Sequence, residues 1–209
     1  MKARTLAGWL AGAALLFGPA CKKQTGDSKP APRDAAAEND GAPPPPEPPP
    51  PLRDAELTLD GWRFQLKVPE GFESSDRDPG VYRTPGAMMT VRTGCGSPCD
   101  PERLLAKSAE LVAGEIDGWS ADLPDGNKQR PQIQKNERLE EGRYVYEVLV
   151  PAGGGLLSEP SLAGAVLLFR EGWPKYVVCE WNVALETAPT FRPALDEACR
   201  ALQVVAAGS

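Results

Sequence analysis

The five cysteines are the residues of this sequence with the most specific chemistry. Cys95 and Cys99 flank the turn-prone segment Gly96-Ser97-Pro98, so their side chains can pair locally. Cys99 also precedes an expected helix N-terminus, a position that can lower the pKa of a thiol and favour redox exchange. The spacing is C-x3-C, not the C-x2-C of thioredoxin-like sites, and no thioredoxin-like pattern surrounds it. A structural disulfide is the main interpretation, and a redox switch or a four-cysteine zinc site are its alternatives.

Histidine is absent from the sequence. Its absence excludes Ser-His-Asp and Cys-His nucleophile systems and the HExxH metalloprotease motif. It also removes the commonest transition-metal ligand. Carboxylate-only chemistry, Ser-Lys pairs and cysteine redox chemistry remain, but no catalytic motif stands out. We therefore expect a protein that is not an enzyme and that binds no metal or cofactor.

Cys21 directly follows a segment with the features of an export signal. Lys2 and Arg4 precede an apolar stretch from Thr5 to Phe17, and Gly18-Pro19-Ala20 follows it. A charged start, a short apolar core and a small-residue end are typical of a signal peptide, here over residues 1–20. A cysteine directly after such a signal is what a lipoprotein signal peptidase requires, because its thiol receives the lipid. We therefore expect Cys21 to be lipidated, as in bacterial lipoproteins.

Two other interpretations of the leader stay open. Lipoboxes usually have leucine three residues before the cysteine, where this chain has Gly18, and an ordinary signal peptidase would also accept a cut after Ala20. An uncleaved anchor is the other alternative, but about 16 apolar residues fall short of the roughly 20 that a spanning helix needs. Lys22 replaces the aspartate that often retains lipoproteins in the inner membrane, so we expect delivery to the outer membrane.

The segment from Lys22 to Arg53 contains almost no large apolar residues, and only Glu47 interrupts the prolines from Pro43 to Pro51. Such a run favours an extended polyproline II helix that rises about 3.1 Å per residue. It cannot bury enough apolar surface to offset the entropy of ordering the chain. We predict that residues 21–53 form a lipidated cysteine and a disordered tether that holds the folded domain off a membrane surface.

The mature chain is acidic. The full sequence has a net charge of −6, and removing the leader takes away the positive charges of Lys2 and Arg4 and gives −8. This balance argues against binding to nucleic acid and to anionic lipid by charge alone. The membrane is therefore expected to be reached through the lipid anchor.

Residues 54–209 have the length of one ordinary domain, with strand patterns interspersed with helix patterns. Apolar alternation or apolar runs predict strands at 62–68, 81–84, 87–93, 133–139, 143–150, 162–170 and 176–183. Asp100-Pro101 is a typical helix start, and apolar residues at helical spacing extend that helix to about Ile116. A polar loop is expected at 117–130, a turn at Glu141-Gly142 and a last helix after Thr190.

The last strand and the last helix each carry a cysteine inside an apolar stripe. Val177, Cys179, Trp181 and Val183 share one face of the strand. The helix stripe consists of Phe191, Leu195, Cys199 and Leu202. Packing the stripes together brings Cys179 and Cys199 into reach, which leaves Cys95 to pair with Cys99. Four cysteines permit three connectivities, and the sequence alone does not exclude the other two.

The order of these elements, with their residues, is similar to the PsbP-like fold that the Mog and DcrB families share. The resemblance covers most of 56–205 and rests on Val68-Pro69-Glu70-Gly71-Phe72, the mid-chain helix and the run of antiparallel strands. It also rests on the strand-to-helix unit from Tyr176 to Val205, with Ala198-Cys199-Arg200-Ala201-Leu202 near its end. The resemblance implies an α+β fold, an antiparallel sheet with helices packed on it, here stapled by disulfides. It also implies a docking or accessory role, although no binding residue carries over.

Trp119 and Trp173 are the candidate partner contacts. Trp119 lies in the polar loop and Trp173 in the turn Glu171-Gly172-Trp173-Pro174, where an aromatic side chain can anchor a protein or a sugar. The favoured alternative is that both cover the domain's own core. Asp122, Asp125 and Asn127 offer oxygen ligands, but their spacing is not that of an EF-hand, so a solvated loop is expected there instead of calcium.

These observations predict an envelope lipoprotein that acts as a binding or accessory module for a protein partner. A periplasmic hydrolase that uses carboxylates is the first alternative, and it requires two acidic groups about 5 to 10 Å apart in a cleft. A thiol redox protein is the second, and it requires an easily reduced Cys95–Cys99 pair.

Overall fold

The structure is a computed structural model and describes residues 47–96, 99–155 and 157–207. The predicted signal peptide, the predicted lipidation site Cys21 and most of the predicted tether lie outside these residues. Within the described ranges, no helix has the length and apolar character that crossing a membrane requires.

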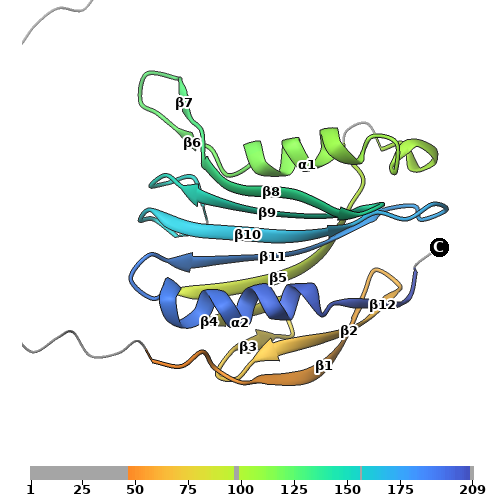
Figure 1. The fold of residues 1–209 in the computed structure, drawn as a ribbon, viewed down its shortest axis with the longest axis horizontal. Helices are drawn as coiled ribbons and strands as arrows, with labels where there is room; N and C mark the ends of the chain where they lie inside the picture. Colours follow the sequence, from red (N-terminus) through yellow and green to blue (C-terminus); the bar gives the residue numbers. More distant parts are fainter. Residues whose placement is uncertain (1–46, 97–98, 156, 208–209) are drawn as a thin grey trace, which may run out of the picture. The chain divides into compact units, whose positions relative to one another are not determined.

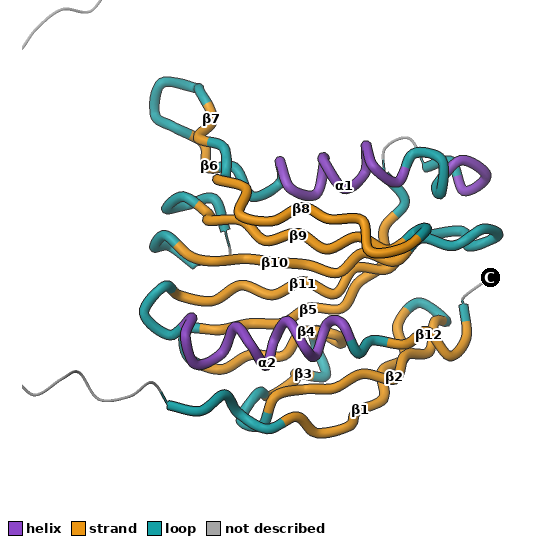
Figure 2. The backbone as a smooth tube through the Cα atoms, in the orientation of Figure 1, coloured by secondary structure: helices purple, strands orange, loops and turns teal. Residues whose placement is uncertain are grey.

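Most of the regular secondary structure of the described residues is antiparallel β-sheet (Figures 1 and 2). The strands are β1 (Leu52–Leu59), β2 (Trp62–Pro69), β3 (Glu73–Ser75), β4 (Asp78–Thr84), β5 (Ala87–Gly94), β6 (Ala121–Asp122), β7 (Lys128–Gln129), β8 (Gln132–Glu140), β9 (Arg143–Val150), β10 (Ser161–Leu168), β11 (Tyr176–Ala184) and β12 (Gln203–Ala206). A seven-stranded sheet has the order β3-β4-β5-β11-β10-β9-β8, and a smaller sheet has the order β1-β2-β12. Strands β6 and β7 form a separate hairpin.

Two helices cover opposite faces of the seven-stranded sheet. Helix α2 (Ala188–Arg200) packs on β10 and β11 and also on β2 of the small sheet, so that it lies between the two sheets (Figure 1). Helix α1 (Ser108–Asp117) lies on the other face, where it packs against β9. The antiparallel sheet with packed helices confirms the predicted α+β class.

The core under α2 contains both predicted cysteine stripes. The stripe of β11 and the buried face of α2 belong to one apolar cluster, together with the inward side chains of β2. Cys179 and Cys199 are at most 1% exposed in it. They lie at disulfide distance with Cα atoms 5.3 Å apart, as the predicted pairing requires. The two apolar stripes could be predicted because strand and helix periodicities already decide which side chains face inward.

The core under α1 is built from the other side chains of the same strands. Tyr144, Tyr146 and Val148 of β9 pack there with alternate residues of β10 and β11 and with Val112 and Ile116 of α1. Strand β10 therefore has both faces covered, as its unbroken apolar run predicts.

The predicted strands are all present, but the mid-chain helix begins later than expected. Residues 101–103 form a single 3-10 turn (η1, Pro101–Arg103), and α1 starts only at Ser108. Leu104 is buried in the core under α1 and Leu105 packs beside Gly142, so the segment bends around the end of the sheet. To the extent that the structure describes its neighbours, the Asp100 side chain makes no capping hydrogen bond.

The sequence-based prediction missed β1, β3, β12 and the β6–β7 hairpin. Strand β1 begins at Leu52, inside the segment that we expected to be tether. Leu57 is the one buried residue among its eight, and Leu52, Ala55 and Leu59 are only half-buried, so its apolar pattern is short. Pairing with all eight residues of β2 is what makes it a strand.

Candidate functional site

An ion-pair cluster joins α1 to the seven-stranded sheet. Arg92 of β5 donates from Nε and Nη2 to the carboxylate of Glu180 on β11, at 3.1 and 2.9 Å. Its Nη1 and Nη2 also donate to the carboxylate of Glu115 on α1, where the Nη1 contact is 3.2 Å. Tyr176 of β11 donates to the same Glu115 carboxylate at 2.6 Å. We call these four residues the Arg92 cluster.

Sheet register and helix position explain why the cluster forms. Glu180 is paired with Thr90 and Arg92 with Val178 across the β5–β11 ladder, so Arg92 and Glu180 are diagonal neighbours on one face. The position of Glu115 depends on how α1 packs. Val112 and Ile116 face the sheet, and Glu115 lies beside them in the helix. The sequence contains one signal that we did not use, the charged Glu180 inside the apolar run of β11.

The cluster also borders a cavity of about 240 Å³, with Gly118, Trp119, Gly154 and Gly155 on its other sides. Trp119 donates its indole N–H to the phenol oxygen of Tyr146 at 2.9 Å. Burial raises the pKa of Tyr146 above its usual range, and the bond from Trp119 offsets only part of that shift. Burial likewise raises the pKa of Tyr176, and the bond to Glu115 adds to it.

The Arg92 cluster has the features of a structural ion-pair contact. Burial disfavours the charged guanidinium, but its bonds to Glu180 and Glu115 outweigh that cost and raise the pKa of Arg92. Both carboxylates accept charge-assisted hydrogen bonds from one cation, whereas an acid–base pair needs one carboxyl group free to give up a proton. The cluster thus holds α1 on the sheet, and its two acidic groups are engaged in doing so.

A second feature is an open groove at the end of the sheet where β10 turns into β11. One side is formed by the turn at 170–174, and the other by Pro101, Glu102 and Leu105 of the segment before α1. The groove has a volume of about 420 Å³. In Figure 1 the light-blue β10–β11 turn lies beside the green segment that precedes α1. We call it the Trp173 groove.

Trp173 itself is half-buried. The inner part of its indole packs edge-to-face on Trp62, with ring centroids 5.2 Å apart, and it contacts the core under α2. Pro174, Pro101 and Leu105 add apolar surface to the groove, while Glu102, Glu171 and Arg170 are exposed at its rim. The groove therefore combines an apolar, partly aromatic floor with two acidic groups and one basic group.

The structure separates the two candidate tryptophans. Trp119 is only 7% exposed, and its indole N–H is bonded to Tyr146, so it covers the core as the favoured alternative expected. Trp173 covers the core by packing on Trp62, and it also lines an open groove. A role for either residue in partner contact stays a prediction.

The remaining sequence candidates have local explanations. Asp125 accepts hydrogen bonds from the backbone and side-chain N–H groups of Asn127, which lower the pKa of Asp125 and close the β6–β7 turn. Within the described ranges, no group of three histidine, cysteine or acidic residues could hold a metal ion. Cys95 and Cys99 lie at disulfide distance with Cα atoms 5.0 Å apart, as predicted.

Comparison with known proteins gives structural likeness only. No protein-family model matches the sequence, and no curated protein sequence does. The crystal structure of the Ran-binding protein Mog1p from Saccharomyces cerevisiae matches 74% of this chain and 97% of its own, at 15% identity and a TM-score of 0.44. A point mutant of Mog1 matches 74% of this chain and 96% of its own, at 16% identity and a TM-score of 0.45.

The solution structure of PsbP (CyanoP) from the cyanobacterium Synechocystis is a further match. It covers 73% of this chain and 92% of its own, at 16% identity and a TM-score of 0.37. Mog and PsbP are the families that were expected to share this fold. Likeness at these scores carries no function from those proteins to this chain.

Proposed function

We propose that this protein is a lipid-anchored binding module of a bacterial envelope, which docks a segment of a partner protein in the Trp173 groove. The observation that carries the proposal is the open groove of about 420 Å³ in which a tryptophan is left half-exposed. Half-exposed aromatic side chains in a groove are typical anchors of protein interfaces. The proposal needs no catalytic group.

The rim charges indicate what kind of segment fits. Glu102 and Glu171 place two carboxylates at the rim against the one guanidinium of Arg170. An indole face beside carboxylates favours a lysine or arginine side chain, through both charge and cation–π attraction. The net charge of −6 on the whole chain favours the same kind of partner. We therefore take the occupant to be an extended, basic segment of an envelope protein.

The proposed location in the envelope rests on the N-terminal leader. Cys21 carries the lipid, and the proline-rich tether lets the domain search for its partner at a distance from the outer membrane. About 30 residues of polyproline II would span roughly 90 Å. A non-enzymatic role agrees with the absence of histidine from the chain and with the engagement of Glu115 and Glu180 by Arg92.

Site-specific photo-cross-linking in the native envelope tests the docking site. A photoreactive amino acid replaces Glu171 at the groove or, as the matched control, Leu185 at the opposite end of β11. Leu185 is 47% exposed and Glu171 is exposed too, so the probe is accessible at both positions. We expect one discrete cross-linked product from position 171 and none from position 185. Equal products from the two positions, or none from either, would contradict the proposed docking site.

Two variants then connect the product to the groove. Trp173→Ala should reduce its yield by about tenfold, as the loss of an interface anchor does. Because Trp173 also packs on Trp62, the double charge reversal Glu102→Lys with Glu171→Lys tests the rim without touching the core. For this pair the photoreactive residue moves to Arg170, and the yield should again fall. Cys21→Ala tests the lipid anchor. It should release the protein from membranes and abolish lipid labelling.

A further inference from the structure

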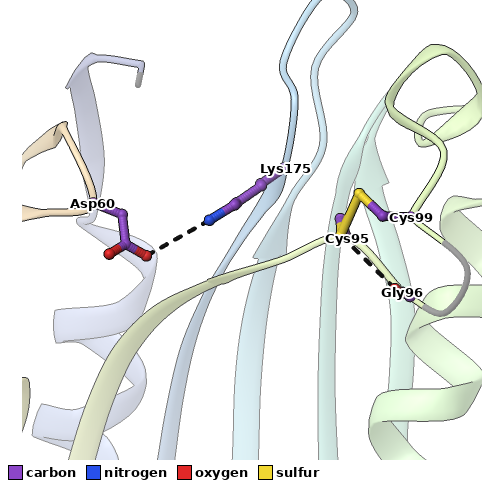
Figure 3. Close-up of a disulfide and its surroundings, with 5 residues drawn as sticks. All are labelled: Asp60, Cys95, Gly96, Cys99 and Lys175. Carbon is purple, nitrogen blue, oxygen red and sulfur yellow. Dashed lines mark hydrogen bonds and ion pairs between the residues drawn. A yellow bond between two sulfur atoms is a disulfide. The ribbon is translucent and has the colours of Figure 1, made fainter. Parts of the chain in front are cut away.

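The Cys95–Cys99 disulfide closes the segment that leads into the Trp173 groove. Cys95 follows β5 directly, and Cys99 precedes the groove residues Pro101 and Glu102 by two and three positions. The bond therefore ties one side of the groove to the end of the seven-stranded sheet. Figure 3 shows this disulfide between the end of β5 and the segment that leads to α1.

The other side of the groove is held independently of that disulfide. Trp173 packs on Trp62, and the Lys175 ammonium lies 3.6 Å from the Asp60 carboxylate in the β1–β2 turn (Figure 3). Both contacts join the β10–β11 turn to the small sheet. Opening the Cys95–Cys99 bond would thus free one side of the groove and leave the other in place.

Among the described residues, the segment from Cys99 to Lys107 is held mainly by Leu104 and Leu105, which pack on the core under α1. It has one 3-10 turn, and its backbone bonds are local, such as Arg103 N–H to Asp100 C=O at 3.1 Å and Lys107 N–H to Arg103 C=O at 2.9 Å. Leu104 is its buried anchor, at 3% exposed, while Pro101 and Glu102 are exposed. A segment with few long-range bonds depends on its cross-link for its position.

The two disulfides also differ in accessibility. Cys99 is exposed and Cys95 half-buried, whereas Cys179 and Cys199 are at most 1% exposed. Exchange requires a thiolate to reach a sulfur atom in line with the bond, so access determines which disulfide reacts in the folded protein. A reductant can therefore reach Cys99 without unfolding of the domain.

We propose that Cys95–Cys99 is a thiol–disulfide exchange site, at which a dithiol reductant releases one side of the Trp173 groove and so changes docking. A thiolate of the reductant attacks Sγ of Cys99, the S–S bond breaks, and Cys95 leaves as a thiolate that takes up a proton. The second thiol of the reductant attacks the mixed disulfide and releases Cys99. Two electrons pass to the protein, and the reductant leaves as its own disulfide. The effect on docking rests on the proposed function, whereas the exchange itself does not.

Graded reduction of the full chain tests the exchange. The native protein is treated with increasing dithiothreitol, its thiols are blocked with N-ethylmaleimide, and peptide mass spectrometry reports labelling at each cysteine. We expect Cys95 and Cys99 to be half-labelled at a reductant concentration at least about tenfold below that needed for Cys179 and Cys199, because the second pair opens only with the core. Simultaneous labelling of both pairs, or earlier labelling of Cys179 and Cys199, would overturn the proposal.

Limited trypsin digestion tests the release of the groove side without any partner. Arg103 and Lys107 lie in the segment that the disulfide holds, and Arg170 lies on the opposite side of the groove. Selective reduction should speed cleavage after Arg103 or Lys107 by on the order of tenfold and leave cleavage after Arg170 unchanged. The oxidant-insensitive variant Cys95→Ser with Cys99→Ser should behave like the reduced protein. Unchanged cleavage after Arg103 and Lys107 in both the reduced protein and the variant would show that the disulfide does not hold this side of the groove. That result would overturn the proposal even if cross-linking at position 171 had succeeded.

Discussion

Helices α1 and α2 cover opposite faces of one sheet, but different forces hold them there. The buried face of α2 is apolar, and the Cys179–Cys199 bond joins it to β11 inside the core. Helix α1 has a narrower apolar contact, and Arg92 links its Glu115 to the sheet. Its disulfide lies outside the helix, in the exposed segment that precedes it. The α2 side therefore contributes mainly to stability, whereas the α1 side has a disulfide and charged groups that solvent can reach.

The difference explains where the candidate sites lie. The Arg92 cluster and its cavity are under α1, and the Trp173 groove is bordered by the segment that leads into α1. Binding regions are commonly drawn from the less rigid parts of a fold, because an adjustable surface must not carry the main core. The proposed docking and exchange sites fit that pattern.

The largest expected effect is the loss of the buried disulfide. Cys179→Ala with Cys199→Ala opens a loop with a sequence separation of 20, and should lower the free energy of unfolding by about 3 kcal/mol on the chain-entropy model. Cys95→Ala with Cys99→Ala is the matched variant, with a separation of 4 and an expected loss of about 2 kcal/mol at most. Urea unfolding at neutral pH measures both. A larger loss for the exposed pair would reverse the comparison between the two sides.

Breaking the Arg92 cluster should have a smaller and more local effect. Arg92→Met leaves Glu115 and Glu180 facing each other without a cation and should cost about 2 kcal/mol. This is less than for a fully buried pair, because the Arg92 side chain is 35% exposed and solvent screens it.

Hydrogen exchange read by mass spectrometry locates that loss. Amides of α1 should exchange faster in Arg92→Met, and those of α2 should keep their protection. Arg192→Met is the matched control, because Arg192 of α2 pairs with Glu147 at 2.7 Å and is 50% exposed. Uniform loss of protection in both helices would show that the cluster does not act on α1 in particular.

The smallest effect concerns alkaline pH. Burial raises the pKa of Tyr146 and of Tyr176 on the α1 side, and it also raises the pKa of Tyr82 under α2. In the unfolded chain tyrosine ionises near pH 10, whereas these folded phenols stay neutral to higher pH. Their contribution to stability is therefore complete below about pH 10 and is lost as the pH rises above it.

Urea unfolding at pH 9 and pH 11 measures this loss, with an expected contribution of about 1 kcal/mol from Tyr146 at pH 11. Tyr146→Phe with Tyr176→Phe should remove more of the alkaline loss than Tyr82→Phe does. If Tyr82→Phe removed as much, the alkaline loss of stability would not distinguish the α1 side from the α2 side.

Local periodicity was enough for much of this fold. The strands from β2 to β11 with clear alternation or apolar runs are where the sequence predicts them, because side-chain direction in a strand repeats every two residues. The pairing of Cys179 with Cys199 followed from the same periodicity. Strand β1 did not follow, because it is a strand through its pairing with β2 and its own apolar pattern is short. The late start of α1 did not follow either, because it depends on the packing of Leu104 in the core under that helix.

The sequence by itself indicated the class of fold, favoured two of the possible cysteine pairings and excluded histidine chemistry, since these depend on residue types and on short-range periodicity. Only the tertiary structure decided that Arg92, Glu115 and Glu180 meet, and that Trp173 faces Pro101 across a groove. The reason is the strand order: β11 lies between β5 and β10, and antiparallel pairing brings the end of β5 beside the start of β11. No local pattern encodes which strands become neighbours, because that choice depends on how the whole core packs.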